Sequence, residues 1–128
     1  MNNNVSNFKK EFKLRIYKYS ICLIKFLQKL PNNDNIKDIK RQVMRSGTSI
    51  SANYFEAEAA SSKKDFQNYF HISLKSGNET KFWLAIIRDA KICPVFLISE
   101  NNHLLQETIE LTKILASSLI TMKKNQNN

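Results

Sequence analysis

The chain has 128 residues and a formal net charge of +9, which is enough length for one domain with a buried core. Its two Gly and two Pro favour a few long helices over many short strands. No run reaches the ~18 apolar residues that a membrane span needs, and the polar start MNNNVSN is not followed by the apolar stretch of a signal peptide. The two cysteines are isolated, so we expect a reduced, cytoplasmic protein.

The first helix is predicted over residues 5–30, where apolar residues recur at steps of three and four. This is the spacing of a helix face in a bundle, and a second apolar stripe runs beside the first. Pro31 and the Asn-rich segment after it end the helix. The first stripe comprises Val5, Phe8, Phe12, Ile16, Tyr19, Leu23, Phe26 and Leu30, and the second comprises Leu14, Tyr17, Ile21, Ile24 and Leu27.

The second helix is predicted over residues 35–60, and it includes the passage SGTSISANYFEAEAA, whose Ser and Ala content is typical of a linker. Apolar steps continue through this passage at Ile50, Tyr54 and Ala57, so we interpret it as helix. Gly47 costs about 1 kcal/mol of helix propensity relative to Ala. That cost is tolerable where a neighbouring helix comes close, and further small residues would allow the same approach: Ser46, Ser49, Ala52 and Ala60.

Two further helices are predicted over residues 62–92 and 99–124. Ser62 followed by Asp65 is a capping box that starts the third helix, and Pro94 ends that segment. Ser99 and Glu100 offer the next start, and the polar tail KKNQNN is expected to fray. Short connections make neighbours antiparallel, so the predicted fold is all-α, an up-down-up-down antiparallel four-helix bundle in a single domain over residues 1–128.

Positive charge is concentrated in the first helix, because residues 1–30 hold seven Lys/Arg against one acid. Clustered Lys/Arg gain from releasing condensed counterions, so the predicted partner is RNA or DNA. The alternative is a basic surface that only keeps the protein soluble. Because most aromatic residues follow helical seams, we expect binding through backbone phosphates with weak sequence specificity. The candidate nucleic-acid-binding residues are Lys9, Lys10, Lys13, Arg15, Lys18, Lys25, Lys29, Lys63 and Lys64.

A second candidate site is a polar cluster on the second and third helices. Its carboxylates would need partners if they are buried, and neighbouring Arg, Asn and Ser side chains could supply them. Such a network can fix the register between helices; a ligand or nucleotide pocket is the alternative interpretation. The proposed members of this structural polar network are Arg45, Ser49, Asn53, Glu56 and Glu79.

Enzymatic chemistry has little support in the sequence. A di-iron bundle needs two Glu-x-x-His motifs, and only Glu100 with His103 forms one, so no metal site and no cofactor are expected. Cys22 and Cys93 are predicted to lie in apolar surroundings, where a thiol is usually inert. No Gly-rich phosphate loop is present. We therefore predict a protein that is not an enzyme.

Residues 45–87 resemble the four-helix-bundle family encoded by intervening sequences in bacterial 23S ribosomal RNA genes. The resemblance lies in SISANYFE (49–56), SKKDF (62–66) and ETKFWL (79–84), and residues 110–125 resemble the last helix of the family. The chain departs from the family at Ser51, where many relatives have Pro, at Ala57, where many have Gly, and at Gly77, where the residue is usually larger.

The resemblance implies a homo-oligomer, which is a pentameric barrel in close relatives. It also implies kinship with the accessory proteins of diversity-generating retroelements, which are basic bundles associated with nucleic acid and a reverse transcriptase. Two functional hypotheses follow. The first is a non-enzymatic bundle that binds nucleic acid. The second is a structural or adaptor module for a protein partner such as a reverse transcriptase, in which apolar residues on the first and last helices form the oligomer.

Overall fold

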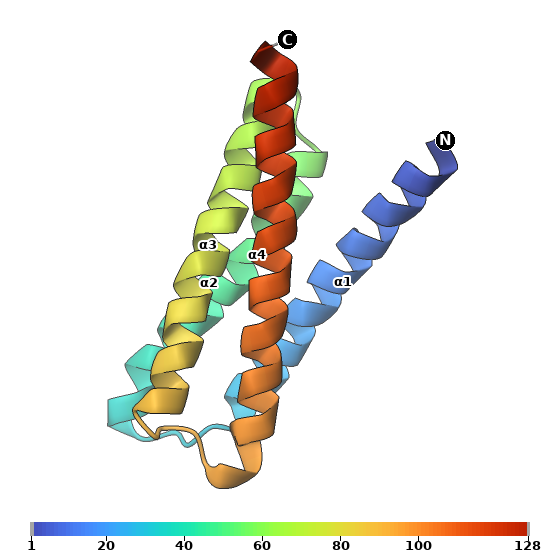
Figure 1. Cartoon of the computed structure of the whole chain (residues 1–128). Helices are drawn as coiled ribbons and strands as arrows, with labels where there is room; N and C mark the ends of the chain where they lie inside the picture. The colour runs from blue at the N-terminus through green and yellow to red at the C-terminus, as the bar shows by residue number, and fades with distance from the viewer. Residues whose placement is uncertain (1, 128) are drawn as a thin grey trace.

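The computed structural model describes residues 2–127, and describes side chains over residues 7–126. Its elements are α1 (Asn2–Lys29), α2 (Asp34–Glu58), α3 (Lys63–Asp89), the 3-10 turn η1 (Val95–Leu97) and α4 (Ile98–Asn127). Successive helices run in opposite directions (Figure 1), and no strand occurs within residues 2–127. The predicted all-α, up-down-up-down bundle is confirmed. Across this same range, none of the helices is long and apolar enough to cross a membrane.

Each helix end lies within three residues of its predicted position, and the ends of α3 and α4 are among those that differ most. α3 ends at Asp89 rather than at residue 92, because Lys91 adopts a φ of 58°, which no continuing right-handed helix can contain. α4 begins directly after the 3-10 turn and runs to Asn127, so helix continues through most of the tail that was expected to fray. The serine half of the capping box is confirmed: Ser62 Oγ accepts a hydrogen bond from the Asp65 backbone N–H at 3.1 Å.

The core follows the predicted seams. On α1, the buried side chains include Phe12, Ile16, Leu23 and Phe26, all from the first stripe. The second stripe of α1 is divided: Leu27 is buried, whereas three of its members are exposed. Those three exposed members are Leu14, Tyr17 and Ile21.

Gly47 lies where α1 crosses α2, and Gly77 lies where α3 packs on α4. A Cβ atom at Gly47 would overlap Leu23, and one at Gly77 would overlap Thr112. The predicted packing role of Gly47 is confirmed, since no larger residue fits there without moving a buried neighbour. Ala52, by contrast, is exposed and takes no part in the close approach predicted for it.

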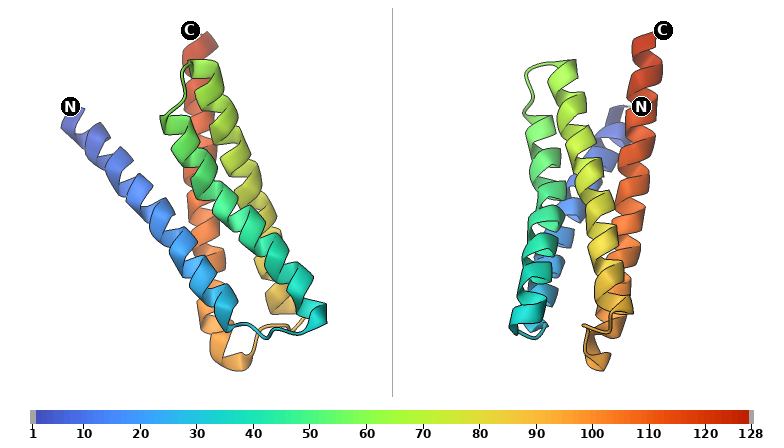
Figure 2. Two further views of the ribbon diagram at one scale, coloured as in Figure 1. Left: turned by 180° about the vertical axis from the view of Figure 1, so that it is seen from behind. Right: turned by 90° about the vertical axis from the view of Figure 1, so that its left-hand side faces the viewer.

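The bundle is open at one of its two ends. α1 diverges from α4 toward its N-terminus (Figures 1 and 2), and Phe8 at this splayed end is 55% exposed. An aromatic row holds α1 to the other helices there: the ring centroids of Phe12 and Tyr54 lie 5.0 Å apart, and those of Tyr54 and Phe70 lie 5.6 Å apart. The divergence follows from composition, because the first turns of α1 are mostly Asn and Lys.

Candidate nucleic-acid interface

All seven basic side chains predicted on α1 are exposed, but they do not form one patch. Lys18, Lys25 and Lys29 are spaced by seven and four residues, so they share one side of the helix. This side faces α4, because Lys29 pairs with Glu100. Lys9 and Lys13 lie on a different side, which faces α2, because Lys13 lies beside Glu58. The structure thus divides the predicted basic surface into two.

On the side of α1 that faces α4, carboxylates neutralise part of the positive charge. Arg15 donates two hydrogen bonds to Glu107, from Nε at 2.8 Å and from Nη2 at 2.7 Å. These hydrogen bonds raise the pKa of Arg15 above its ordinary value. Lys29 Nζ lies 3.0 Å from Glu100 Oε1. Exposed pairs of this kind contribute little to stability, but they leave Arg15 and Lys29 less available to a phosphate.

On the side that faces α2, basic and aromatic side chains lie together. Lys13 Nζ is 3.6 Å from Glu58 Oε2 and 5.0 Å from the centroid of the Phe55 ring, so it makes an ion pair and a cation–π contact. Lys9 and Lys10 make no ion pair with any residue that the structure describes. Their ammonium groups remain available to a polyanion.

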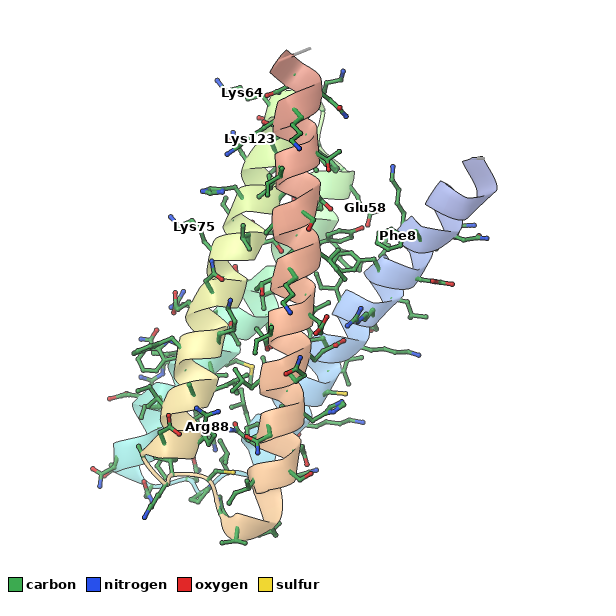
Figure 3. The ribbon with its side chains drawn as sticks, viewed as in Figure 1. Phe8, Glu58, Lys64, Lys75, Arg88 and Lys123 are labelled. Carbon is green, nitrogen blue, oxygen red and sulfur yellow. The ribbon has the colours of Figure 1, made fainter. Side chains whose placement is uncertain are left out.

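A further basic group lies where α3 begins and α4 ends. The two helix ends are adjacent, because they line the same cavity of about 530 Å³ with Lys63 from α3 and with Met122 and Asn125 from α4. Lys64 and Lys123 are both exposed and lie on the same side of the bundle (Figure 3). Sequence reasoning found Lys63 and Lys64 but missed the pair Lys123 and Lys124, because the tail was expected to fray. The signal was available, since the apolar spacing of α4 reaches Met122.

The predicted polar network forms two smaller clusters at the surface between α2 and α3. In the first, Arg45 pairs with Glu79, whose carboxylate also accepts a hydrogen bond from Trp83 Nε1 at 3.1 Å. In the second, Asn53 Nδ2 donates to Ser49 Oγ at 2.8 Å, and Ser49 Oγ lies 2.8 Å from Ser76 Oγ. The Arg45 side chain is 59% exposed, so the network is not buried as expected.

The placement of Glu56 in this network is wrong. Its side chain is exposed, and it makes no hydrogen bond or ion pair among the described residues. The α2 face that packs in the core contains Tyr54 and Ala57. Position 56 is about 200° of helical rotation from Tyr54 and therefore points outward.

Glu56→Gln should leave the free energy of unfolding within about 0.5 kcal/mol of the wild-type value, as for surface positions without partners. Urea denaturation followed by circular dichroism would measure this difference. A loss above about 1 kcal/mol would restore the structural role that was predicted for Glu56.

The remaining candidates for chemistry do not form a metal-binding cluster in the part of the chain that the structure describes. Glu100 pairs with Lys29, and His103 is exposed; across the described chain, no group of three or more His, Cys, Asp or Glu side chains could hold a metal ion. Burial raises the pKa of the Cys93 thiol, which keeps it protonated. Cys22 was expected in apolar surroundings, but it is exposed and lines a groove of about 520 Å³ with Arg15 and His103.

Comparison with known proteins places the chain in a family. The family model of the 23S rRNA-intervening sequence protein matches residues 8–117. The chain belongs to this family. A similar solved structure is the crystal structure of a protein of unknown function from the S23 ribosomal protein family of Bacteroides thetaiotaomicron. It is 30% identical, with a TM-score of 0.76, and the match covers 84% of this chain and 97% of that one. The comparison with curated proteins finds no match.

The matched region of this 23S rRNA-intervening sequence protein includes most of the basic residues described above. It begins one residue before Lys9 and contains the pair Lys63 and Lys64. Lys123 and Lys124 lie beyond residue 117. The lysines at the end of α4 therefore lie outside the part of the chain that identifies the family.

Proposed function

We propose that this 23S rRNA-intervening sequence protein is non-enzymatic and binds the phosphate backbone of nucleic acid through one end of its bundle. This basic end contains the start of α1, the corner between α2 and α3, and the end of α4 (Figure 1). The observation that carries the proposal is a set of exposed lysines there that make no ion pair with any described residue. They are Lys9, Lys10, Lys63, Lys64, Lys123 and Lys124.

The opposite end of the bundle supports this assignment by contrast. There, Arg41 pairs with Asp38 and Arg88 pairs with Asp89, with N–O distances of 2.9 and 2.7 Å. Acids are also present at the basic end, but Glu58 is the one that pairs with a base, Lys13. Lys37 and Lys91 at the opposite end are also exposed and make no ion pair with any described residue, but they are two against the six at the basic end. A polyanion would therefore meet more unpaired lysines at the basic end.

The position of Lys63 and Lys64 adds a physical argument. Both lie in the first turn of α3, where the helix dipole is positive and a cation is unfavourable by about 0.3–1 kcal/mol. An arrangement that costs stability is more easily explained when the charges contact a partner. The backbone N–H groups at the start of α3 and the two lysines would together attract phosphate oxygens.

The variant Lys63→Gln/Lys64→Gln should therefore raise the free energy of unfolding by about 0.6–2 kcal/mol, since it removes two such charges, while it weakens nucleic-acid binding. Each lost phosphate contact lowers the slope of log K against log salt by roughly 0.7–0.9, so the slope should fall by about 1–2. Fluorescence anisotropy with labelled RNA and DNA across a salt series measures this slope.

The matched control is Lys37→Gln/Arg41→Gln, which removes two charges from exposed residues of α2 at the far end. It should leave the slope unchanged. If both variants weaken binding equally, the basic end is not the interface, and if the wild type binds no probe even at low salt, the protein does not bind nucleic acid.

A second candidate function is a homo-oligomeric adaptor that binds a protein partner such as the reverse transcriptase of a diversity-generating retroelement. It is favoured by apolar side chains that remain exposed on α1 and α4. Leu14 and Ile120 are 52% and 57% exposed, which is the kind of surface that subunit contacts cover. Charge reversal at Lys9, Lys64 and Lys123 separates the candidates, since it should abolish nucleic-acid binding in the first case and leave the assembly unchanged in the second.

A further inference from the structure

We propose that the nucleic-acid partner is single-stranded, and that the ring of Tyr17 is a platform on which an unpaired base stacks. The proposal rests on the nucleic-acid binding proposed above and specifies its substrate class. It arises from an exposed aromatic pair, Tyr17 and Phe55, which lies among lysines on the side of α1 that faces α2.

The geometry of the pair leaves ring surface available. Tyr17 on α1 is 53% exposed and Phe55 on α2 is 38% exposed. Their centroids are 6.4 Å apart and their planes are tilted by 43°, so neither ring covers the face of the other. Phe55 also packs at an angle of 69° against Tyr54, which is buried in the core. Phe55 thus supports Tyr17 from a fixed position.

Cationic groups lie where the phosphates beside a stacked base would be. Lys13 is one helical turn before Tyr17 and Lys10 is two turns before it, at roughly 6 and 10 Å along the axis. Lys13 already contacts the Phe55 ring. One acid is nearby, Glu58, which pairs with Lys13 at 3.6 Å and is half-exposed. A phosphate can displace such an exposed pair at little cost.

The combination of positive charge and exposed ring surface favours single-stranded nucleic acid as the partner, over a duplex or a second copy of this chain. In a duplex the faces of the bases are covered, whereas every base of a single strand offers one, and stacking on aromatic side chains is the usual way that proteins bind it. A second copy of this chain related by a twofold axis is disfavoured, because such a contact along this side would bring the lysines of both copies together. The charge of Lys10 and Lys13 is complementary to a polyanion.

The test measures binding of three labelled probes at the same salt concentration: a thymidine 20-mer, an abasic strand of that length, and a duplex of that length. The wild type should bind the thymidine strand most tightly. Tyr17→Ala should weaken that binding by roughly 5- to 150-fold, the loss of one stacked base, and should leave abasic binding unchanged. Tyr17→Phe keeps the ring and should retain the affinity, whereas Phe55→Leu should weaken it by less than Tyr17→Ala.

Phe96→Ala is the matched control, because Phe96 is 77% exposed on η1 at the opposite end of the bundle. It should bind all three probes like the wild type. Equal binding of the three probes, with no effect of Tyr17→Ala, would overturn the single-strand inference and leave backbone binding intact. Binding to none of them would overturn the proposed function itself. A Tyr17→Ala variant with a lower sedimentation coefficient would show that this side joins copies of the chain, and would also overturn the inference.

Discussion

Replacing Phe26 with alanine should lower the free energy of unfolding by about 3–5 kcal/mol, the usual cost of truncating a fully buried phenylalanine. Phe26 is 0% exposed and is the largest of the fully buried side chains. The C-terminal half of α1, which contains Phe26, packs closely against the other helices (Figure 2). The surrounding helices could not easily move inward to fill the space left by the ring, because other buried side chains hold each helix in place.

The control for Phe26→Ala is Phe8→Ala on the same helix, which removes the same atoms from a side chain that is 55% exposed. Its cost should stay below about 1 kcal/mol. Urea denaturation followed by far-ultraviolet circular dichroism measures both variants. If Phe8→Ala costs as much as Phe26→Ala, a contact that is absent from the isolated chain covers Phe8 in solution, and the splayed end is an assembly surface.

Gly47→Ala should also destabilise the protein, by about 1–3 kcal/mol, although alanine gains about 1 kcal/mol in helix propensity. The new Cβ would overlap the Cδ2 of Leu23. Leu23 is 0% exposed, so a new conformation of its side chain would displace packed neighbours. The overlap is relieved by that repacking or by a small shift of α1 away from α2.

A double-mutant cycle with Leu23→Ala tests this cause. The smaller side chain makes room for the Cβ atom, so the double variant should be more stable than the sum of the two single losses predicts, by about 0.5–3 kcal/mol. Thermal and urea unfolding of the four proteins gives the coupling energy. Strictly additive losses would mean that the cost arises from neighbours other than Leu23, such as Thr80.

The fold could be predicted because its main signal is local. The steps through Ile16, Leu23 and Phe26 identify α1 as one face of a helix, and the same spacing through Ile50 and Tyr54 identifies a Ser- and Ala-rich passage as helix. The end of α3 could not be predicted as well. Lys91 adopts a left-handed conformation that is uncommon for lysine and that the sequence does not indicate. Pro94 was therefore the signal used for the end of α3, and it lies beyond the actual end at Asp89.

The candidate site was less predictable, because it depends on how the helices lie against one another. Exposure of the α1 lysines follows from their spacing, but the pair Arg15 and Glu107 joins residues 92 positions apart. Whether a given lysine is free or neutralised depends on helix rotation and crossing, which spacing does not specify. Glu56 is a different case: its outward direction follows from Tyr54 and Ala57, so the sequence contained the signal for its correct placement.

The divergence of α1 from the bundle makes stability uneven along a single helix. The side chains of residues 7–11 are all exposed, and a helical segment of this length is marginal on its own. The turns before Phe12 can therefore open without unfolding the core around Phe26, as a separate cooperative unit. Because Lys9 and Lys10 lie on this unit, nucleic acid bound there would hold it in the helical conformation, and part of the binding free energy would be used to order backbone rather than to hold phosphate.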